Sequence, residues 1–286
     1  MDLKKIFLED SCPTKVGGQA VLEGIMMKGE AKTAVAVRLP DDSIHLRTEN
    51  IAEKSKWTKY PIIRGVFIFA GSLVHGTKTL MYSAEVLEKY EGEEGHEPTY
   101  EKDKMTIWLE KRFGVKGAWD IMVYFSVFLA LVFTVGIFII APTALVDFVG
   151  RFVENEIVLN LIEGVLRIVL FVIYIALISR MKDIKTVFQY HGAEHKCIHC
   201  YEKGLDLTIE NCKPFYTLHP RCGTSFLMFV MVISLIVFSL LGWPNLVFRI
   251  LSRLLLLPII AGLSYELLRW AGRSSGTVVK ILSLPG

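Results

Sequence analysis

The chain has 286 residues, of which 52% are hydrophobic and 21% are charged, and its formal net charge is +3. A mean hydropathy of +0.43 is too high for an ordinary soluble domain, and the charged fraction is too large for a chain lying wholly in lipid. The basic residues are spread along the chain, so electrostatics gives no case for nucleic acid as a partner. We therefore expect a membrane protein, with the lipid bilayer as its partner and with a sizeable part of the chain in aqueous solution.

Residues 1–118 are predicted to form an N-terminal α+β region. Two β-rich runs, AVAVRL and SIHLRTE, flank the turn residues PDD, a pattern typical of a β-hairpin. The preceding segment, GGQAVLEGIMMKG, supplies either a further strand or a buried loop. Residues 61–88 predict a helix whose apolar part is too short to span a bilayer, so it is either interfacial or re-entrant. The acidic residues 91–104 are typical of a solvated linker.

Residues 119–286 are predicted to form a four-helix membrane domain. A hydrocarbon core of roughly 30 Å requires about 20 apolar residues per helix. Four hydrophobic runs are interpreted as transmembrane helices, at 121–146, 157–179, 226–241 and 246–268. Glu163 and Arg167 interrupt the second run, and their spacing of four lets them pair on one helix face, which lowers the cost of insertion.

The orientation follows from the distribution of Lys and Arg. These residues collect in the segment 180–224 and in the C-terminal tail, at Arg269, Arg273 and Lys280, whereas the loop 150–156 has only Arg151. By the positive-inside rule, the segment 180–224 and both termini face the cytoplasm. The predicted fold class is therefore a mainly α-helical multi-pass membrane protein with four transmembrane helices and an N-terminal α+β cytoplasmic region containing a β-hairpin.

Potential metal ligands concentrate between His191 and Cys222, a segment with four histidines and four of the five cysteines. His191 and His195 stand four apart in a stretch that can continue the second span as a helix, so both imidazoles project from one face toward one divalent ion. With Glu194 they give the order H-x-x-E-H of inverzincins, in which the glutamate acts on water held by the metal. We expect Glu194 to be the general base, and Glu266, His219 or Cys222 to supply the third ligand.

A second geometry uses sulfur. Cys197 and Cys200 form a C-x-x-C pair, and His219 and Cys222 form an H-x-x-C pair at a separation seen in closed zinc sites. Such a site would hold the loop together and leave no position for a substrate.

Each of these residues also has a structural interpretation. His191 and His195 could be interfacial histidines bonded to the backbone or to lipid headgroups, and Glu266 could pair with Arg269 three residues later. Gln19 and Glu23 are either polar contacts near the site or exposed turn residues.

Three motifs in this order, GGQAVLEGIMMKG, YHGAEHK and HPRCGTSF, resemble the bacterial YqhQ-type membrane family, a domain-of-unknown-function family described as a predicted metal-dependent enzyme. The resemblance covers nearly the whole chain and implies a bacterial inner-membrane location. By motif position it points to Gln19, Glu23, His191, Glu194, His195, His219 and Cys222. Cys197 and Cys200 fall outside these motifs.

We therefore expect a zinc-dependent hydrolase of the cytoplasmic membrane, acting on a peptide or an amphiphilic small molecule. One alternative is a non-enzymatic membrane module whose zinc is structural and whose N-terminal region recruits a cytoplasmic partner. Another is a component of ion or solute transport that uses Glu163, Arg167 and Glu266. Four spans form a thin pathway, so that alternative requires a homo-oligomer.

Overall fold

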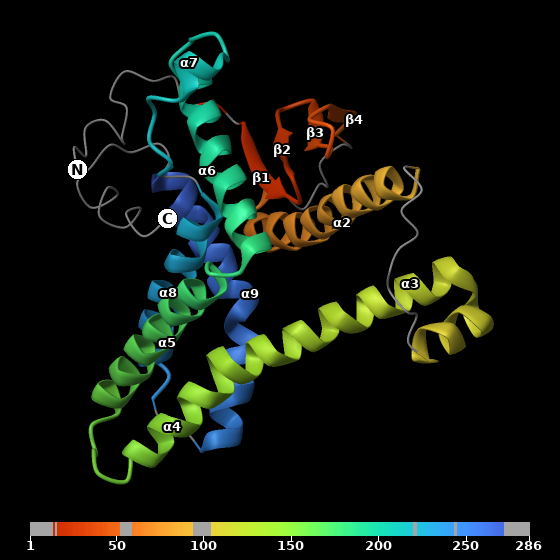
Figure 1. The fold of residues 1–286 in the computed structure, drawn as a ribbon. Coiled ribbons are helices and arrows are strands. Elements are labelled where there is room, and N and C mark those ends of the chain that lie inside the picture. Colours follow the sequence, from red (N-terminus) through yellow and green to blue (C-terminus); the bar gives the residue numbers. More distant parts are fainter. Residues whose placement is uncertain are drawn as a thin grey trace.

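The computed structural model describes residues 14, 16–51, 59–93, 104–219, 222–242 and 245–271. Its N-terminal part is a four-stranded antiparallel sheet in the order β1-β2-β3-β4, and the rest of the described chain is mainly helical (Figure 1). The strands are β1 (Gly17–Val21), β2 (Gly24–Lys28), β3 (Lys32–Arg38) and β4 (Ile44–Asn50).

The predicted hairpin is confirmed as β3 and β4, which pair from Arg38 with Ile44 through Lys32 with Asn50. The segment GGQAVLEGIMMKG forms two further strands, β1 and β2, rather than one strand or a loop. Alternate residues of β2 and β3 are buried, as expected of strands with one covered face. Their core is Val21, Met26, Val35 and Val37, against which Tyr82, Val86 and Leu87 pack.

The predicted helix at 61–88 is present and longer, as α2 (Ile63–Glu93). It links the sheet to the membrane helices, because its C-terminal half covers the sheet core while its start packs against α9 (Leu246–Ala271). The helices cross closely: a Cβ atom added to Gly65 would lie 2.8 Å from the Cα atom of Gly262. Beside this crossing Arg64 Nε donates to Glu266 Oε1 at 2.6 Å. Most of the predicted acidic linker lies outside the described residues, as do Arg273 and Lys280.

Three helical segments are long and apolar enough to cross a membrane, at residues 117–149, 156–178 and 246–270. The first joins α3 (Lys104–Val135), the π-helical η2 (Gly136–Ile140) and α4 (Ala141–Val149). Its α3 part extends away from the other helices, and none of its most apolar window is buried, whereas η2 and α4 contact α5 and α9 (Figure 1). The second is α5 (Glu156–Ile178), and the third lies in α9. The helices thus support association with a membrane.

The fourth predicted span, at 226–241, is not shown. The corresponding helix, α8 (Gly223–Ser239), has 17 residues, and its apolar part is confined to Phe226–Ser239. At 1.5 Å per residue the whole helix rises about 25 Å, less than a typical hydrocarbon core. It packs against α5 and α9 and so belongs to the same bundle.

The predicted cytoplasmic loop at 180–224 is largely helical. It contains α6 (Lys182–Glu202) and the short α7 (Ile209–Cys212). The backbone turns between α5 and α6, where Met181 has an extended conformation with ψ of 136°, so α6 is a separate helix rather than a continuation of the second span. This turn lays α6 against β1 and β2 instead of leaving it in line with α5.

The close crossing of α2 and α9 predicts different effects for two glycines of α2. Gly65→Ala should lower the free energy of unfolding by about 1–3 kcal/mol, because the new methyl group overlaps the backbone of α9. Gly71 is exposed and has no atom within 4 Å of an added Cβ, so Gly71→Ala should leave stability unchanged or raise it by up to about 1 kcal/mol. Melting temperatures in detergent test this contrast, and equal values for the two variants would contradict the crossing.

Candidate metal site

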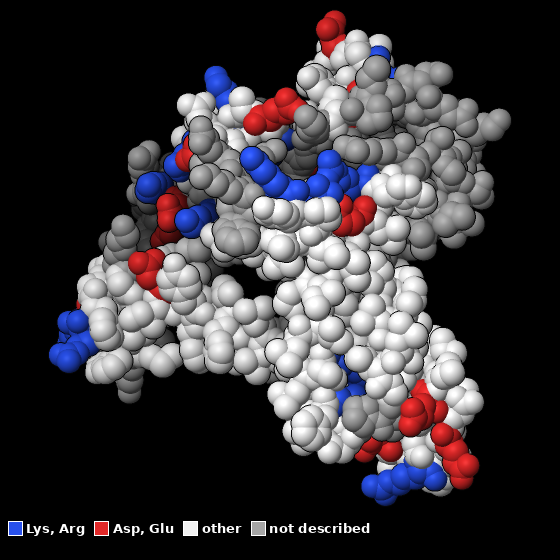
Figure 2. All heavy atoms as spheres, turned by 180° about the vertical axis from the view of Figure 1, so that it is seen from behind, with Lys and Arg blue, Asp and Glu red and all other residues white. Residues whose placement is uncertain are grey.

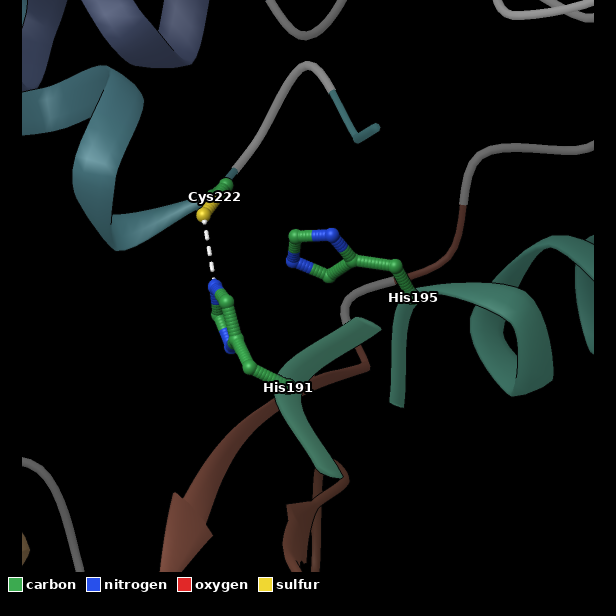
Figure 3. Close-up of side chains that lie close together, drawn as sticks. All are labelled: His191, His195 and Cys222. Atoms are coloured by element: carbon green, nitrogen blue, oxygen red, sulfur yellow. Dashed lines mark hydrogen bonds between the residues drawn. The ribbon is translucent and has the colours of Figure 1, made fainter. Parts of the chain in front are cut away.

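Three potential ligands converge from two parts of the chain that are distant in sequence. His191 and His195 lie one turn apart on α6, and their ring centroids are 4.3 Å apart. Cys222 immediately precedes α8 and faces both rings (Figure 3). One ligand atom from each residue lies within 4.8 Å of the other two. Tetrahedral zinc places nitrogen and sulfur ligands about 3.5 Å from one another. The three ligand atoms would therefore have to move only slightly closer together to bind that ion.

Hydrogen bonds orient both imidazole rings toward the cysteine. The Nδ1 atom of His191 lies 3.1 Å from Glu194 Oε2, and its Nε2 atom lies 3.1 Å from Cys222 Sγ. His195 Nδ1 donates to the backbone carbonyl of Thr217. Metal-binding histidines typically donate their second ring nitrogen to a carboxylate or a carbonyl group, which fixes the tautomer and leaves the other nitrogen for the ion. Both histidines have this arrangement.

Glu194 lies behind His191 and against the sheet. Its side chain is only 3% exposed, and a Cβ atom added to Gly18 of β1 would lie 2.7 Å from its Cδ and Oε1 atoms. The absence of a side chain at position 18 therefore lets β1 approach the carboxylate. This position suits Glu194 to orienting His191, because the carboxylate is held between the histidine and the strand.

The imidazole of His191 and the thiol of Cys222 form an ion pair when no metal is bound. The hydrogen bonds that His191 donates to Cys222 and to Glu194 raise its pKa to about 10, although burial opposes this. Burial would raise the pKa of Cys222, but hydrogen bonds and positive charge from His191 and His195 outweigh it and bring this pKa to about 5. At neutral pH the cysteine is thus a thiolate, the form in which it binds metals.

The other predicted site residues lie around this group. His219 is buried, with its ring centroid 5.5 Å from that of His195, but it does not join the three ligand atoms. Glu266 pairs with Arg64 at the crossing of α2 and α9. Gln19 Nε2 donates to the carbonyl oxygen of Gly76 at 3.2 Å, and Glu23 accepts from the hydroxyl group of Tyr190 at 3.3 Å.

The closed site predicted from the C-x-x-C pair and the H-x-x-C pair is not assembled. The Cys200 thiol points toward the carbonyl oxygen of Asp206 at 3.5 Å, while Cys222 lies with His191 and His195. Burial, followed by interactions with Cys212, raises the pKa values of Cys197 and Cys200 to about 11, so both are protonated thiols at neutral pH. Among the described residues, no fourth His, Cys, Asp or Glu joins the three candidate ligands.

Sequence reasoning did not single out two residues close to the site. His199 lies four residues after His195, and its ring centroid lies 4.8 Å from that of His219. The repeated spacing of four between histidines could have indicated it. Thr217 contributes its backbone carbonyl, which no side-chain pattern reveals.

The fold and the site define a mainly helical protein with apolar helices long enough to cross a membrane and a largely buried His-His-Cys cluster beside a small sheet. The chain belongs to the family described as "Protein of unknown function (DUF1385)", which matches residues 60–286. It is 31% identical over 278 residues to "Uncharacterized protein YqhQ" of Bacillus subtilis (strain 168), covering 96% of this chain and 84% of that protein. No solved structure matches the chain.

The pKa values predict how metal affinity depends on pH. A metal ion must displace the proton on His191, whose pKa is about 10, whereas Cys222, with a pKa of about 5, is already deprotonated at neutral pH. The apparent affinity for Zn²⁺ should therefore rise about tenfold per pH unit between about pH 7 and pH 9. Competition with a chromophoric chelator measures this slope, and an affinity independent of pH over this range would contradict the proton displacement.

Neighbouring glycines in β1 provide a matched pair of variants. Gly18→Ala should push Glu194 away from His191 and weaken Zn²⁺ binding by about tenfold or more. Gly17→Ala should leave the affinity unchanged, since no atom lies within 4 Å of an added Cβ. Melting temperatures of both variants separate a displaced carboxylate from general unfolding, and equal affinities in two folded variants would show that the contact with β1 does not position the site.

Proposed function

We propose that this protein is a metalloenzyme of the bacterial cytoplasmic membrane, and that one divalent ion, zinc by the chemistry of the ligands, is held by His191, His195 and Cys222. The observation that carries the proposal is the pair of histidines whose Nδ1 atoms are held by Glu194 and Thr217 while their Nε2 sides face the same sulfur. Nitrogen and thiolate ligands suit zinc, and three protein ligands with an open position are typical of catalytic zinc.

The reaction class that fits this site is hydrolysis. When bound, the metal would supply Lewis-acid activation of a water molecule or a carbonyl group. The chain's own residues hold the geometry: His195 is fixed by Thr217, and Glu194 keeps a proton on Nδ1 of His191. The proposal gives Glu194 this positioning role in place of the general-base role that the H-x-x-E-H order suggests, because its Oε2 atom is engaged with His191.

The location of the site favours a substrate at the membrane surface. Cys222 immediately precedes α8, and α6 lies beside the sheet, above the helical bundle in the view of Figure 1. The side chain of His191 is 26% exposed and provides the open edge of the cluster. An amphiphilic small molecule or a peptide close to the membrane could reach this edge. The distribution of Lys and Arg supports a cytoplasmic position for it.

A second candidate is a non-enzymatic module with a structural metal. It is favoured by burial, since His195, Glu194 and Cys222 are each at most 3% exposed. In that case the metal would hold α6 to the start of α8, and the sheet would be free to recruit a cytoplasmic partner.

Elemental analysis of the detergent-purified protein tests the proposed ligands. We expect about one zinc per chain, lost in His191→Ala, His195→Ala and Cys222→Ser. Cys200→Ser and Glu266→Gln should retain the metal, because neither side chain reaches the cluster. A folded wild-type protein without metal would contradict the proposal.

Turnover separates the two candidate functions. A panel of fluorogenic peptides and fatty-acyl esters should reveal hydrolysis that stops with 1,10-phenanthroline and in Cys222→Ser but continues in Cys200→Ser. Stoichiometric zinc without turnover on any probe, together with unfolding on chelation, would favour the structural role instead.

A further inference from the structure

A second cluster of buried charges lies inside the membrane bundle, away from the metal site. It comprises Thr143 of α4, Asn160, Glu163 and Arg167 of α5, and Arg253 of α9, none of which is more than 7% exposed. Thr143 and Asn160 are close in sequence to the turn between α4 and α5, which lies at the end of the bundle opposite α6 (Figure 1). Ionisable residues at such depth are costly and commonly mark a binding site or a pathway.

Two arginines share one carboxylate oxygen. Arg167 Nη2 donates to Glu163 Oε1 at 2.8 Å, which confirms the pair predicted from their spacing, and Arg253 Nη1 donates to the same atom. Thr143 also donates its hydroxyl proton to Oε1, at 2.8 Å. Both guanidinium groups flank the ring of Phe238, at 5.4 and 5.2 Å from its centroid. Two positive charges therefore face one negative charge, which leaves this buried group with an excess charge of +1.

The nearest additional charges do not remove this excess. Arg249, one turn before Arg253, pairs with Asp147 at 2.5 Å, so that pair is neutral by itself. In the space-filling view, Lys or Arg atoms are visible in a recess of the mostly uncharged bundle surface, whose lower end carries Asp or Glu and further Lys or Arg side chains (Figure 2). The basic residues buried in this part of the bundle are Arg167, Arg249 and Arg253. A small anion would both balance the charge and find guanidinium donors here.

Within this cluster, two buried polar atoms lack a hydrogen-bond partner among the described residues: the Nδ2 donor of Asn160 and the Oε2 acceptor of Glu163. They lie three residues apart on one face of α5, and Asn160 Oδ1 already accepts from Arg253 Nη2 at 3.4 Å. A simple anion would satisfy Asn160 but would be repelled by Glu163. A phosphate group that retains one P–OH would satisfy both, because it accepts from Asn160 and Arg253 and donates to Glu163 Oε2.

We propose that Asn160, Glu163, Arg167 and Arg253 form a binding site for a monoanionic phosphate, either inorganic phosphate or the phosphomonoester headgroup of a lipid. The two arginines and Asn160 supply positive charge and donors, and Glu163 selects for the proton on the phosphate. The site is independent of the metal proposed above, because it uses different residues at the other end of the bundle.

Thermal unfolding of the purified, delipidated protein tests the site with two anions of similar shape. Inorganic phosphate near pH 6 should raise the melting temperature in a saturable manner, whereas sulfate, which has no proton to donate to Glu163, should do so at least tenfold less effectively. In nanodiscs, phosphatidic acid should stabilise the protein more than phosphatidylglycerol, whose phosphodiester has no P–OH. A response to inorganic phosphate alone would identify the ligand as a free anion. A response only to phosphatidic acid would identify it as a lipid headgroup.

Asn160→Asp is the most informative variant. It has nearly the same shape and supplies inside the cluster the negative charge that the phosphate would bring, so the protein should fold and lose its response to phosphate. Asn160→Ala removes the donor without adding a charge and should also lose the response. Arg151→Gln, at an exposed basic residue of the same end, should keep it. No response of the wild type, equal responses to phosphate and sulfate, or an unchanged response in both Asn160 variants would overturn the proposal.

Discussion

The close approach of β1 to α6 is the contact on which the candidate metal site depends. Gly18 leaves room for the carboxylate of Glu194, Glu194 accepts from His191, and His191 faces Cys222. Each contact fixes the next. The distance between the backbone of Gly18 and the carboxylate of Glu194 therefore determines the orientation of the His191 imidazole ring. The sheet therefore acts as a support for the site rather than as a separate domain, and α2 joins it to the membrane helices through the crossing at Gly65 and Gly262.

Two groups of buried charged residues differ in their chemistry. Beside the sheet, a thiolate, an imidazole pair and a carboxylate lie around a position that would suit a cation. Within the bundle, paired guanidinium groups outnumber the carboxylate they share and suit an anion. Buried charges are stable only when they are paired and hydrogen-bonded. An incompletely paired group in either place is thus a better indicator of a ligand than an exposed cluster of the same residues.

Local patterns predicted much of this structure. Alternating β-rich runs around Pro-Asp-Asp gave the β3–β4 hairpin, hydrophobic length gave three spans, and a spacing of four gave both the His191 and His195 pair and the Glu163 and Arg167 pair. The errors arose where tertiary packing decides. The turn at Met181 directs α6 onto the sheet, which hydrophobic periodicity does not reveal, and the partner of Glu266 proved to be Arg64, about 200 residues away, rather than its neighbour Arg269. Cys222 was one of three equally eligible third ligands, because sequence gives no distance between α6 and the start of α8.

X-ray absorption at the zinc edge of the purified protein tests the central claim most directly, because it reports the atoms around the metal. The proposed site predicts one sulfur at about 2.3 Å, two imidazole nitrogens at about 2.0 Å and one further light atom. Two or more sulfur ligands, or no sulfur ligand, would contradict the site formed by His191, His195 and Cys222.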